Sequence, residues 1–258
     1  MKFFLLIYLF ANATVLMAQK TDSLPSHVYR WDSVAAKKQK TWTTRAIIEG
    51  STNSLSRFEV TAVTLEPGKA SPPPSASYDV EELLIVKDGL LNITIDGVTK
   101  KLGAGSVAFA MPRMVHGVSN AGNTKATYYL LKYKGKLPMD IDRAKRAGGS
   151  FMLDWNELAT TNTDKGYRRD FFNRPTSQLG QFEMHTTALN ANEESHAPHT
   201  HVQEEIILVL RGNVEMYIDG DRYNASAGDV VFLSSRVPHN LTNTGEGQCE
   251  YFAFQWRN

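Results

Sequence analysis

The chain has 258 residues, of which 42% are hydrophobic and 21% are charged, so it can form a sizeable globular core. Its 28 Lys and Arg residues nearly balance its 27 Asp and Glu residues, and the resulting net charge of +1 predicts no nucleic-acid partner. Cys249 is the single cysteine, which excludes an internal disulfide and a cysteine-based zinc or iron–sulfur site.

The first 18 residues predict a secretory signal peptide. Lys2 gives a short positive start, residues 3–17 are largely apolar, and Ala18 is a small residue at the expected cleavage point. The apolar run is too short for a comfortable membrane span, although an uncleaved anchor is an alternative. We expect a secreted mature protein that begins near Gln19 and does not associate with a membrane after cleavage. In a Gram-negative source it would be periplasmic.

The rest of the chain repeats itself, which indicates two copies of one unit. With an offset of 123 residues, identical residues recur in the two halves, among them Glu82 and Glu205, Gly89 and Gly212, Gly105 and Gly228, His116 and His239, and Asn120 and Asn243. Farther upstream the offset is 124, which pairs Trp31 with Trp155. We therefore expect one domain at residues 28–134, a linker at 135–150 and a second domain at 151–258.

Each copy has the pattern of short strands in the same order. Apolar runs at 83–86 and 206–210 are followed by strands that end in Asp-Gly turns, at 92–97 and 215–220. Further strands are expected at 106–109 and 128–131 in the first copy, and at 229–232 and 251–254 in the second. Many short strands separated by turns predict an all-β fold of sandwich or barrel type.

The second copy carries a set of potential metal ligands. His199 and His201 are two residues apart, so on an extended segment their side chains point to the same side. Glu205 has the same parity, and His239 arrives from a later strand. Three imidazoles and one carboxylate suit a divalent transition metal. We predict that these four residues bind the metal and that Glu205 also acts catalytically, as a proton acceptor.

The first copy lacks half of this set. Ala76 and Tyr78 occupy the positions of the first two histidines, and only Glu82 and His116 remain. We expect this half to be metal-free and structural, with a second ligand pocket as the alternative.

Further residues of the second copy are candidates for the walls of a substrate pocket: His196, Met216, Phe232 and Gln255. For the last three, packing in the core is the alternative, and His196 could instead be an exposed loop residue. Glu204 should face away from Glu205. Because its counterpart Glu81 is also acidic, a structural role between the two halves is expected for both.

These spacings resemble the two motifs of the cupin family. His199-x-His201, three residues, Glu205, six residues and Gly212 are similar to the first motif. Gly228 through Pro238-His239, three residues and Asn243 are similar to the second. Two positions depart from the motifs: Glu193 stands where the first often has glycine, and 234–236 lacks the usual glycine of the second. The resemblance implies a bicupin, with two tandem jelly-roll β-barrels and a metal in the second.

The two-barrel plan also resembles that of the (S)-ureidoglycine aminohydrolase-like bicupins, which use Mn. At the site that family has Glu in place of His199, His in place of Glu205, Gln in place of His239 and a substrate-contacting Lys in place of Gln255. The resemblance implies a metal-dependent hydrolase or lyase that acts on a small polar metabolite.

Other cupins leave two alternatives open. The set of three His and one Glu is also that of many cupin dioxygenases, which would use Fe or Mn. A non-catalytic protein that binds a sugar or small acid is the other alternative. Mn or Fe is thus the favoured cofactor, with Ni or Zn as further options, and a small molecule is the expected partner. A homo-oligomer also remains open.

Overall fold

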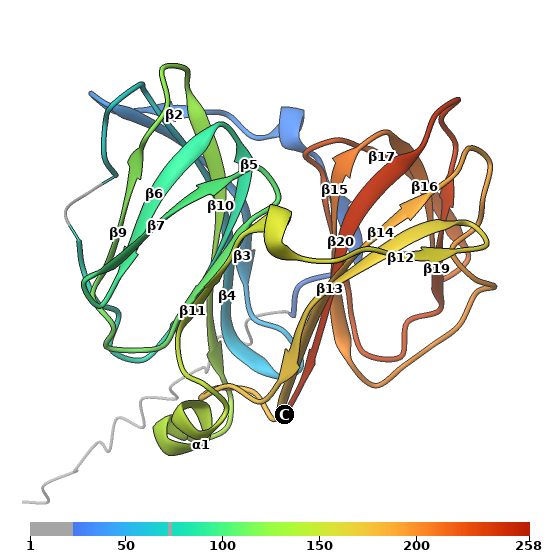
Figure 1. Cartoon of the computed structure of the whole chain (residues 1–258). Coiled ribbons are helices and arrows are strands. Elements are labelled where there is room, and N and C mark those ends of the chain that lie inside the picture. Colours follow the sequence, from blue (N-terminus) through green and yellow to red (C-terminus); the bar gives the residue numbers. More distant parts are fainter. Residues whose placement is uncertain (1–22, 72–73) are drawn as a thin grey trace, which may run out of the picture.

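The computed structural model describes residues 23–71 and 74–258, so the predicted signal peptide at residues 1–18 lies outside the described residues. Two similar β-sheet halves lie side by side (Figure 1). Each half combines a seven-stranded sheet with a three-stranded sheet, which confirms the predicted all-β fold with two tandem barrels. Within the described residues, no helix is long and apolar enough to cross a membrane.

The larger sheet of the first half has the spatial order β11-β8-β5-β10-β4-β3-β2. Its strands are β11 (Phe151–Leu153), β8 (Val107–Ala110), β5 (Glu81–Asp88), β10 (Ala126–Gly135), β4 (Leu55–Leu65), β3 (Trp42–Gly50) and β2 (Lys37–Lys38). The smaller sheet has the order β7-β6-β9, with β7 (Val98–Gly103), β6 (Leu90–Ile95) and β9 (His116–Asn120). The predicted Asp-Gly turn joins β6 to β7, and its residues Asp96 and Gly97 both have positive φ, 48° and 80°.

The second half repeats this arrangement. Its larger sheet has the order β1-β18-β15-β20-β14-β13-β12. Its strands are β1 (His27–Tyr29), β18 (Val230–Leu233), β15 (Glu204–Arg211), β20 (Cys249–Arg257), β14 (Gln181–Leu189), β13 (Gly166–Arg174) and β12 (Thr161–Thr163). The smaller sheet has the order β17-β16-β19, with β17 (Asp221–Ser226), β16 (Asn213–Ile218) and β19 (His239–Asn243). The described helices are short: η1 (Trp31–Ser33), α1 (Ile141–Arg146) and η2 (Trp155–Glu157).

The two halves exchange one edge strand each. β1, from the start of the chain, pairs with β18 of the second half, whereas β11 pairs with β8 of the first half. Each of these strands thus joins the sheet of the half opposite to the one in which the expected boundaries, 28–134 and 151–258, place it. The exchange covers the edges of β8 and β18, which would otherwise expose unpaired backbone groups.

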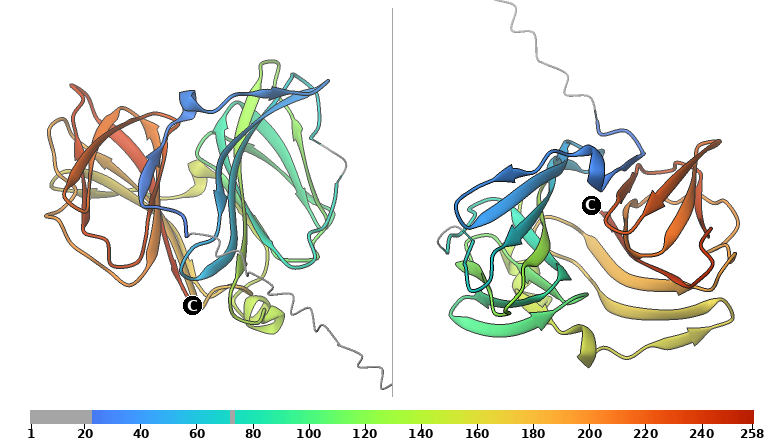
Figure 2. Two further views of the ribbon diagram at one scale, coloured as in Figure 1. Left: turned by 180° about the vertical axis from the view of Figure 1, so that it is seen from behind. Right: turned by 90° about the horizontal axis from the view of Figure 1, so that it is seen from above.

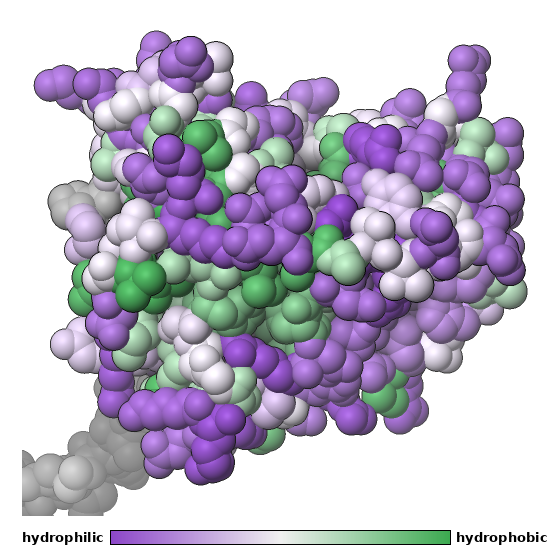
Figure 3. Space-filling view, in the orientation of Figure 1, coloured by the Kyte–Doolittle hydropathy of each residue, from purple (hydrophilic) through white to green (hydrophobic). Residues whose placement is uncertain are grey.

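The larger sheets of the two halves face each other across a shared apolar core. Figure 2 shows these sheets at the centre of the molecule and the smaller sheets on the outside. The ring of Phe58 in the first half packs 6.3 Å from that of Phe232 and 5.4 Å from that of Trp256 in the second. Separate apolar clusters fill the interior of each barrel. Seen from outside, apolar surface gathers along the seam between the halves (Figure 3).

Two buried glutamates connect the halves, as expected for Glu204 and Glu81. Glu204 accepts hydrogen bonds from the Thr52 hydroxyl at 2.8 Å and from the Asn53 N–H at 2.7 Å, both in the first half. Its twin Glu81 accepts bonds from Thr176 at 2.6 Å and from the Ser177 N–H at 2.7 Å, in the second half. Because each carboxylate satisfies a turn of the opposite half, the halves form one structural unit.

Candidate metal centre

The four predicted ligands come from three segments that the fold brings together. His199 and His201 lie in the loop before β15, Glu205 is the second residue of β15, and His239 is the first residue of β19. The loop is fastened to β19 by two backbone hydrogen bonds, from His199 N to His239 O at 3.2 Å and from His239 N to His199 O at 3.0 Å. As a result, one potential ligand atom from each of the three histidines lies within 4.8 Å of the others.

Backbone carbonyl groups orient two of the imidazole rings. Nδ1 of His201 lies 2.9 Å from the carbonyl oxygen of Gln203, and Nδ1 of His239 lies 2.8 Å from that of Val237. A carbonyl oxygen only accepts, so Nδ1 carries a proton in both rings, and Nε2 is the nitrogen that could bind a metal. In the described structure, Nε2 of His201 is hydrogen-bonded to Glu205, and this contact raises the pKa of His201, so the ring would lose its Nε2 proton when it binds a metal. Both Nε2 atoms point to one oxygen of Glu205, at 3.2 Å for His201 and 3.1 Å for His239.

One of these ring nitrogens has no hydrogen-bond partner among the described residues. Nε2 of His239 is buried, and its contact with Glu205 at 3.1 Å is an ion-pair contact rather than a hydrogen bond. Buried polar atoms without a partner are rare and need an explanation such as an ion. A divalent transition metal, which prefers imidazole nitrogen and carboxylate oxygen, fits this donor set.

The electrostatics of the site favour an ionised carboxylate. Burial opposes ionisation of Glu205, but its interactions with His201 and His239 outweigh that cost, so its pKa lies well below the usual value. Burial and the neighbouring histidines lower the pKa of His199, which favours the neutral imidazole that a metal requires. Gln255 donates to the second oxygen of Glu205 at 3.2 Å and thereby holds the carboxylate in place.

Three of the potential ligands, His199, Glu205 and His239, line a cavity of about 330 Å³ in the second barrel. His196, Met216 and Gln255 line it, as predicted. The ring centroid of His196 lies 4.1 Å from that of His199, on the exposed side of the ligand cluster.

Phe232, also predicted as a pocket wall, is a wrong prediction. It is fully buried in the core between the two halves, packed against Phe58 and Trp256. Its neighbours Val231 and Leu233 belong to the interior of the barrel instead. Side chains alternate along a strand, so Phe232 on β18 points away from the cavity.

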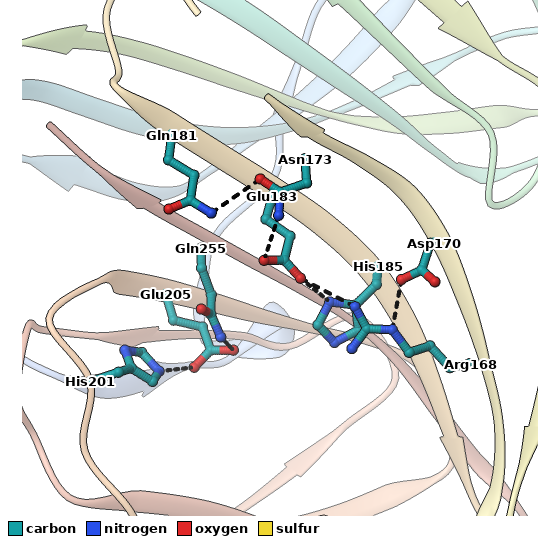
Figure 4. A network of polar contacts seen from close by, with 9 residues as sticks. All are labelled: Arg168, Asp170, Asn173, Gln181, Glu183, His185, His201, Glu205 and Gln255. Atoms are coloured by element: carbon teal, nitrogen blue, oxygen red, sulfur yellow. Dashed lines mark hydrogen bonds and ion pairs between the residues drawn. The ribbon is translucent and has the colours of Figure 1, made fainter. Parts of the chain in front are cut away.

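A polar network forms one wall of this cavity, and sequence reasoning did not identify it (Figure 4). Glu183 on β14 and Glu205 on β15 lie in register with Gln255 on β20, which places all three in one row. Arg168 on β13 donates to Glu183 at 3.2 Å, and His185 Nδ1 lies 3.6 Å from the same carboxylate. Arg168 and His185 both line the cavity, so a guanidinium group and an imidazole ring face its interior.

The equivalent site in the first half has a different set of contacts. His116 Nε2 lies 2.8 Å from one oxygen of Glu82, while the other oxygen accepts from the Ser77 hydroxyl and lies 3.3 Å from Lys132 Nζ. Tyr78, at the position of His201, is exposed. Of the four equivalent positions, only Glu82 and His116 offer a ligand atom, and a metal-free first half stays a prediction.

A comparison with protein families matches the cupin domain twice, at residues 61–132 and 185–254, more than half of the chain. The chain belongs to the cupin family. With two such domains in one chain, it is a bicupin. No curated protein matches it.

Several solved structures are similar to this bicupin. AerE from Microcystis aeruginosa is 16% identical with a TM-score of 0.67, over 87% of this chain and 97% of AerE. Protein Ylba from E. coli is 19% identical with a TM-score of 0.68, over 93% of this chain and 95% of Ylba. Oxalate decarboxylase from Lactobacillus farciminis, solved with formate, is 13% identical with a TM-score of 0.69, over 92% of this chain and 87% of that one. Identities this low establish a common fold only.

Proposed function

We propose that the second barrel binds one divalent transition metal, Mn or Fe in preference to Ni or Zn, through His199, His201, Glu205 and His239. The observation that carries this proposal is the convergence of three imidazoles on one buried carboxylate, with a buried His239 Nε2 that has no hydrogen bond in the described structure.

We further propose that the protein is a metal-dependent enzyme of hydrolase or lyase type that acts on a small polar metabolite. Such an ion, when bound, polarises a carbonyl or carboxylate oxygen or lowers the pKa of a bound water molecule. The cavity of about 330 Å³ is at the lower end of the roughly 300–1,000 Å³ typical of small-molecule sites. Oxalate decarboxylase, one of the similar structures, is named for a small carboxylate substrate.

The protein's own side chains would orient such a substrate. Arg168 offers a guanidinium group that can bind a carboxylate or carbonyl oxygen, and Asp170 and Glu183 fix its position. Met216 and Leu241 form an apolar part of the wall that keeps water from the reacting groups. Glu205 is in direct contact with two of the histidines, so loss of its charge should affect metal affinity and activity together.

The assay for this proposal is turnover of a panel of small carboxylates, ureides and hydroxy acids by the metal-loaded mature chain, in parallel with and without O₂. Turnover that is equal in both conditions and is lost in His239→Ala supports a hydrolase or lyase. Turnover that needs O₂ overturns that reaction class in favour of a cupin dioxygenase. A tight metal site without turnover of any panel member would favour a non-catalytic binding protein.

The control for the His239 variant is His27→Ala. His27 lies at the start of β1, and its ring packs 5.2 Å from that of Tyr223, outside the cavity. This variant should retain full activity. From the predicted signal peptide, we also propose that the enzyme is secreted, and periplasmic in a Gram-negative host.

A further inference from the structure

The first barrel contains a second cavity of about 320 Å³, almost as large as the one at the candidate metal centre. Its polar lining includes Glu82, His116 and Lys132, and Trp42, Leu84 and Leu130 supply apolar wall. In place of the histidine cluster of the second half, this cavity has an ammonium group. Lys132 on β10 occupies the position that Gln255 has on β20, and it lies in register with Glu82 as Gln255 does with Glu205.

The hydrogen-bond partners of His116 favour a charged ring. Nδ1 lies 3.0 Å from the carbonyl oxygen of Met114, and Nε2 lies 2.8 Å from the carboxylate of Glu82. Both partners only accept, so each ring nitrogen must carry a proton. Burial opposes this charge, but the bonds to Glu82 and Met114 outweigh it and raise the pKa of His116. Burial opposes ionisation of Glu82, but the hydrogen bonds from His116 and Ser77 and the charges of His116 and Lys132 lower its pKa to about 2.

The cavity therefore has one uncompensated positive charge. Lys132 and His116 contribute two positive charges, and Glu82 contributes one negative charge. Glu59, which flanks Lys132 on β4, is paired with Arg57 at 2.6 Å, so that pair adds no net charge. Both oxygens of Glu82 already have hydrogen-bond donors, whereas the ammonium group of Lys132, which lies 3.3 Å from Glu82, has three N–H donors. The remaining donors can face the cavity.

We propose that the first barrel is a metal-independent binding site for a small organic monocarboxylate, with Lys132 as the residue that anchors the carboxylate. A single negative charge balances the lining, and an ammonium–carboxylate hydrogen bond is strong in a partly buried site. The apolar wall of Trp42, Leu84 and Leu130 accommodates the carbon skeleton, and hydroxyl groups such as those of Thr44 and Thr61 offer further polar contacts. This site does not depend on the metal proposed for the second barrel.

Calorimetric titration of the full mature chain with benzoate, pyruvate and lactate tests the proposal, with the matching neutral amides as probes of charge. At least one acid should bind in a 1:1 ratio and about tenfold more tightly than its amide, because the loss of a bond to a charged group costs about 1.5–3 kcal/mol. Equal binding of acid and amide, or no binding of any acid up to about 10 mM, overturns the proposal.

Lys132→Gln is the variant that locates the bound acid. Glutamine already occupies the equivalent position in the second half, where Gln255 bonds to Glu205, so the substitution is compatible with the fold. It should weaken binding about tenfold. Lys134→Gln is the matched control on the same strand, because Lys134 pairs with Asp79 at 2.7 Å away from the cavity and its removal should leave affinity unchanged.

Two more variants test which of the two cavities the acid occupies. Thr61→Phe fills the first cavity without changing any charge and should also abolish binding. Gln255→Leu changes the second cavity and should leave binding intact. If Lys132→Gln and Thr61→Phe both bind as the wild type does, or if only Gln255→Leu loses binding, the acid does not occupy the first barrel and the proposal is wrong.

Discussion

Glu204→Gln should destabilise the whole molecule although Glu204 lies outside both cavities. The carboxylate is buried and accepts hydrogen bonds from Thr52, Asn53 and Ser54 of the other half. The indole N–H of Trp256 is a further donor, at 3.1 Å. Glutamine has the same shape but offers one oxygen in place of two.

The size of the effect follows from these contacts. If the amide oxygen takes the place of Oε2, the amide nitrogen faces the N–H of Asn53, which is then unsatisfied at about 1–3 kcal/mol. Each remaining bond loses the extra strength of a charged acceptor, roughly 1 kcal/mol. Removal of a buried charge offsets part of this cost. The free energy of unfolding should therefore fall by about 2–4 kcal/mol.

Guanidinium unfolding followed by tryptophan fluorescence and circular dichroism measures this change. Glu81→Gln should show a similar loss, because Glu81 accepts equivalent bonds from Thr176 and Ser177. Glu215→Gln is the control: its partner Arg222 is largely exposed, so the change should be within about 1 kcal/mol. A loss below about 1 kcal/mol for both buried glutamates would refute the role of these contacts between the halves.

Three further predictions follow from the same structure. Phe232→Ala should cost about 3–5 kcal/mol of stability and leave metal content unchanged, and loss of metal in a folded variant would contradict its position in the core between the halves. A chain that begins at Arg30 should melt at a lower temperature than one that begins at Ser23, because it lacks β1; equal melting temperatures would argue against the strand exchange. The pKa of Glu82 is about 2 in the folded protein, below the value of 4.5 expected in the unfolded chain. Ionised Glu82 therefore stabilises the fold by up to about 3 kcal/mol above pH 4.5, and this contribution disappears as the pH falls toward 2. The stability of Glu82→Gln should lack this dependence in urea titrations from pH 6 to pH 2, and an unchanged profile would contradict the contact with His116.

Much of the fold and of the candidate site could be predicted because the two halves of the sequence carry the same pattern of strands and turns. The paired Asp-Gly turns and glycines defined the repeat, and the parity of His199, His201 and Glu205 placed their side chains together. The same alternation predicted that Glu204 and Glu205 point to opposite faces of the strand. In the structure, Glu204 contacts the other half, whereas Glu205 contacts the histidine cluster.

Other features depend on information that alternation does not contain. β18 is buried on both faces, so its apolar run does not reveal which face lines the barrel, and Phe232 was assigned to the wrong one. The positions of Arg168 and His185 depend on the register of β13 with β14, which shifts at an irregularity between Asp170 and Phe172. The strand exchange depends on which edges are open, a property of the assembled sheets.

The metal content of the purified mature chain, beside that of His199→Ala and of His27→Ala, tests the central claim most directly. We expect about one Mn, Fe, Ni or Zn ion per chain in the wild type and in His27→Ala, and its loss in His199→Ala. A wild type that binds no metal after reconstitution with each of these ions would contradict a metal site in the second barrel. So would a full complement of metal in His199→Ala, because the ion would then lie outside the histidine cluster.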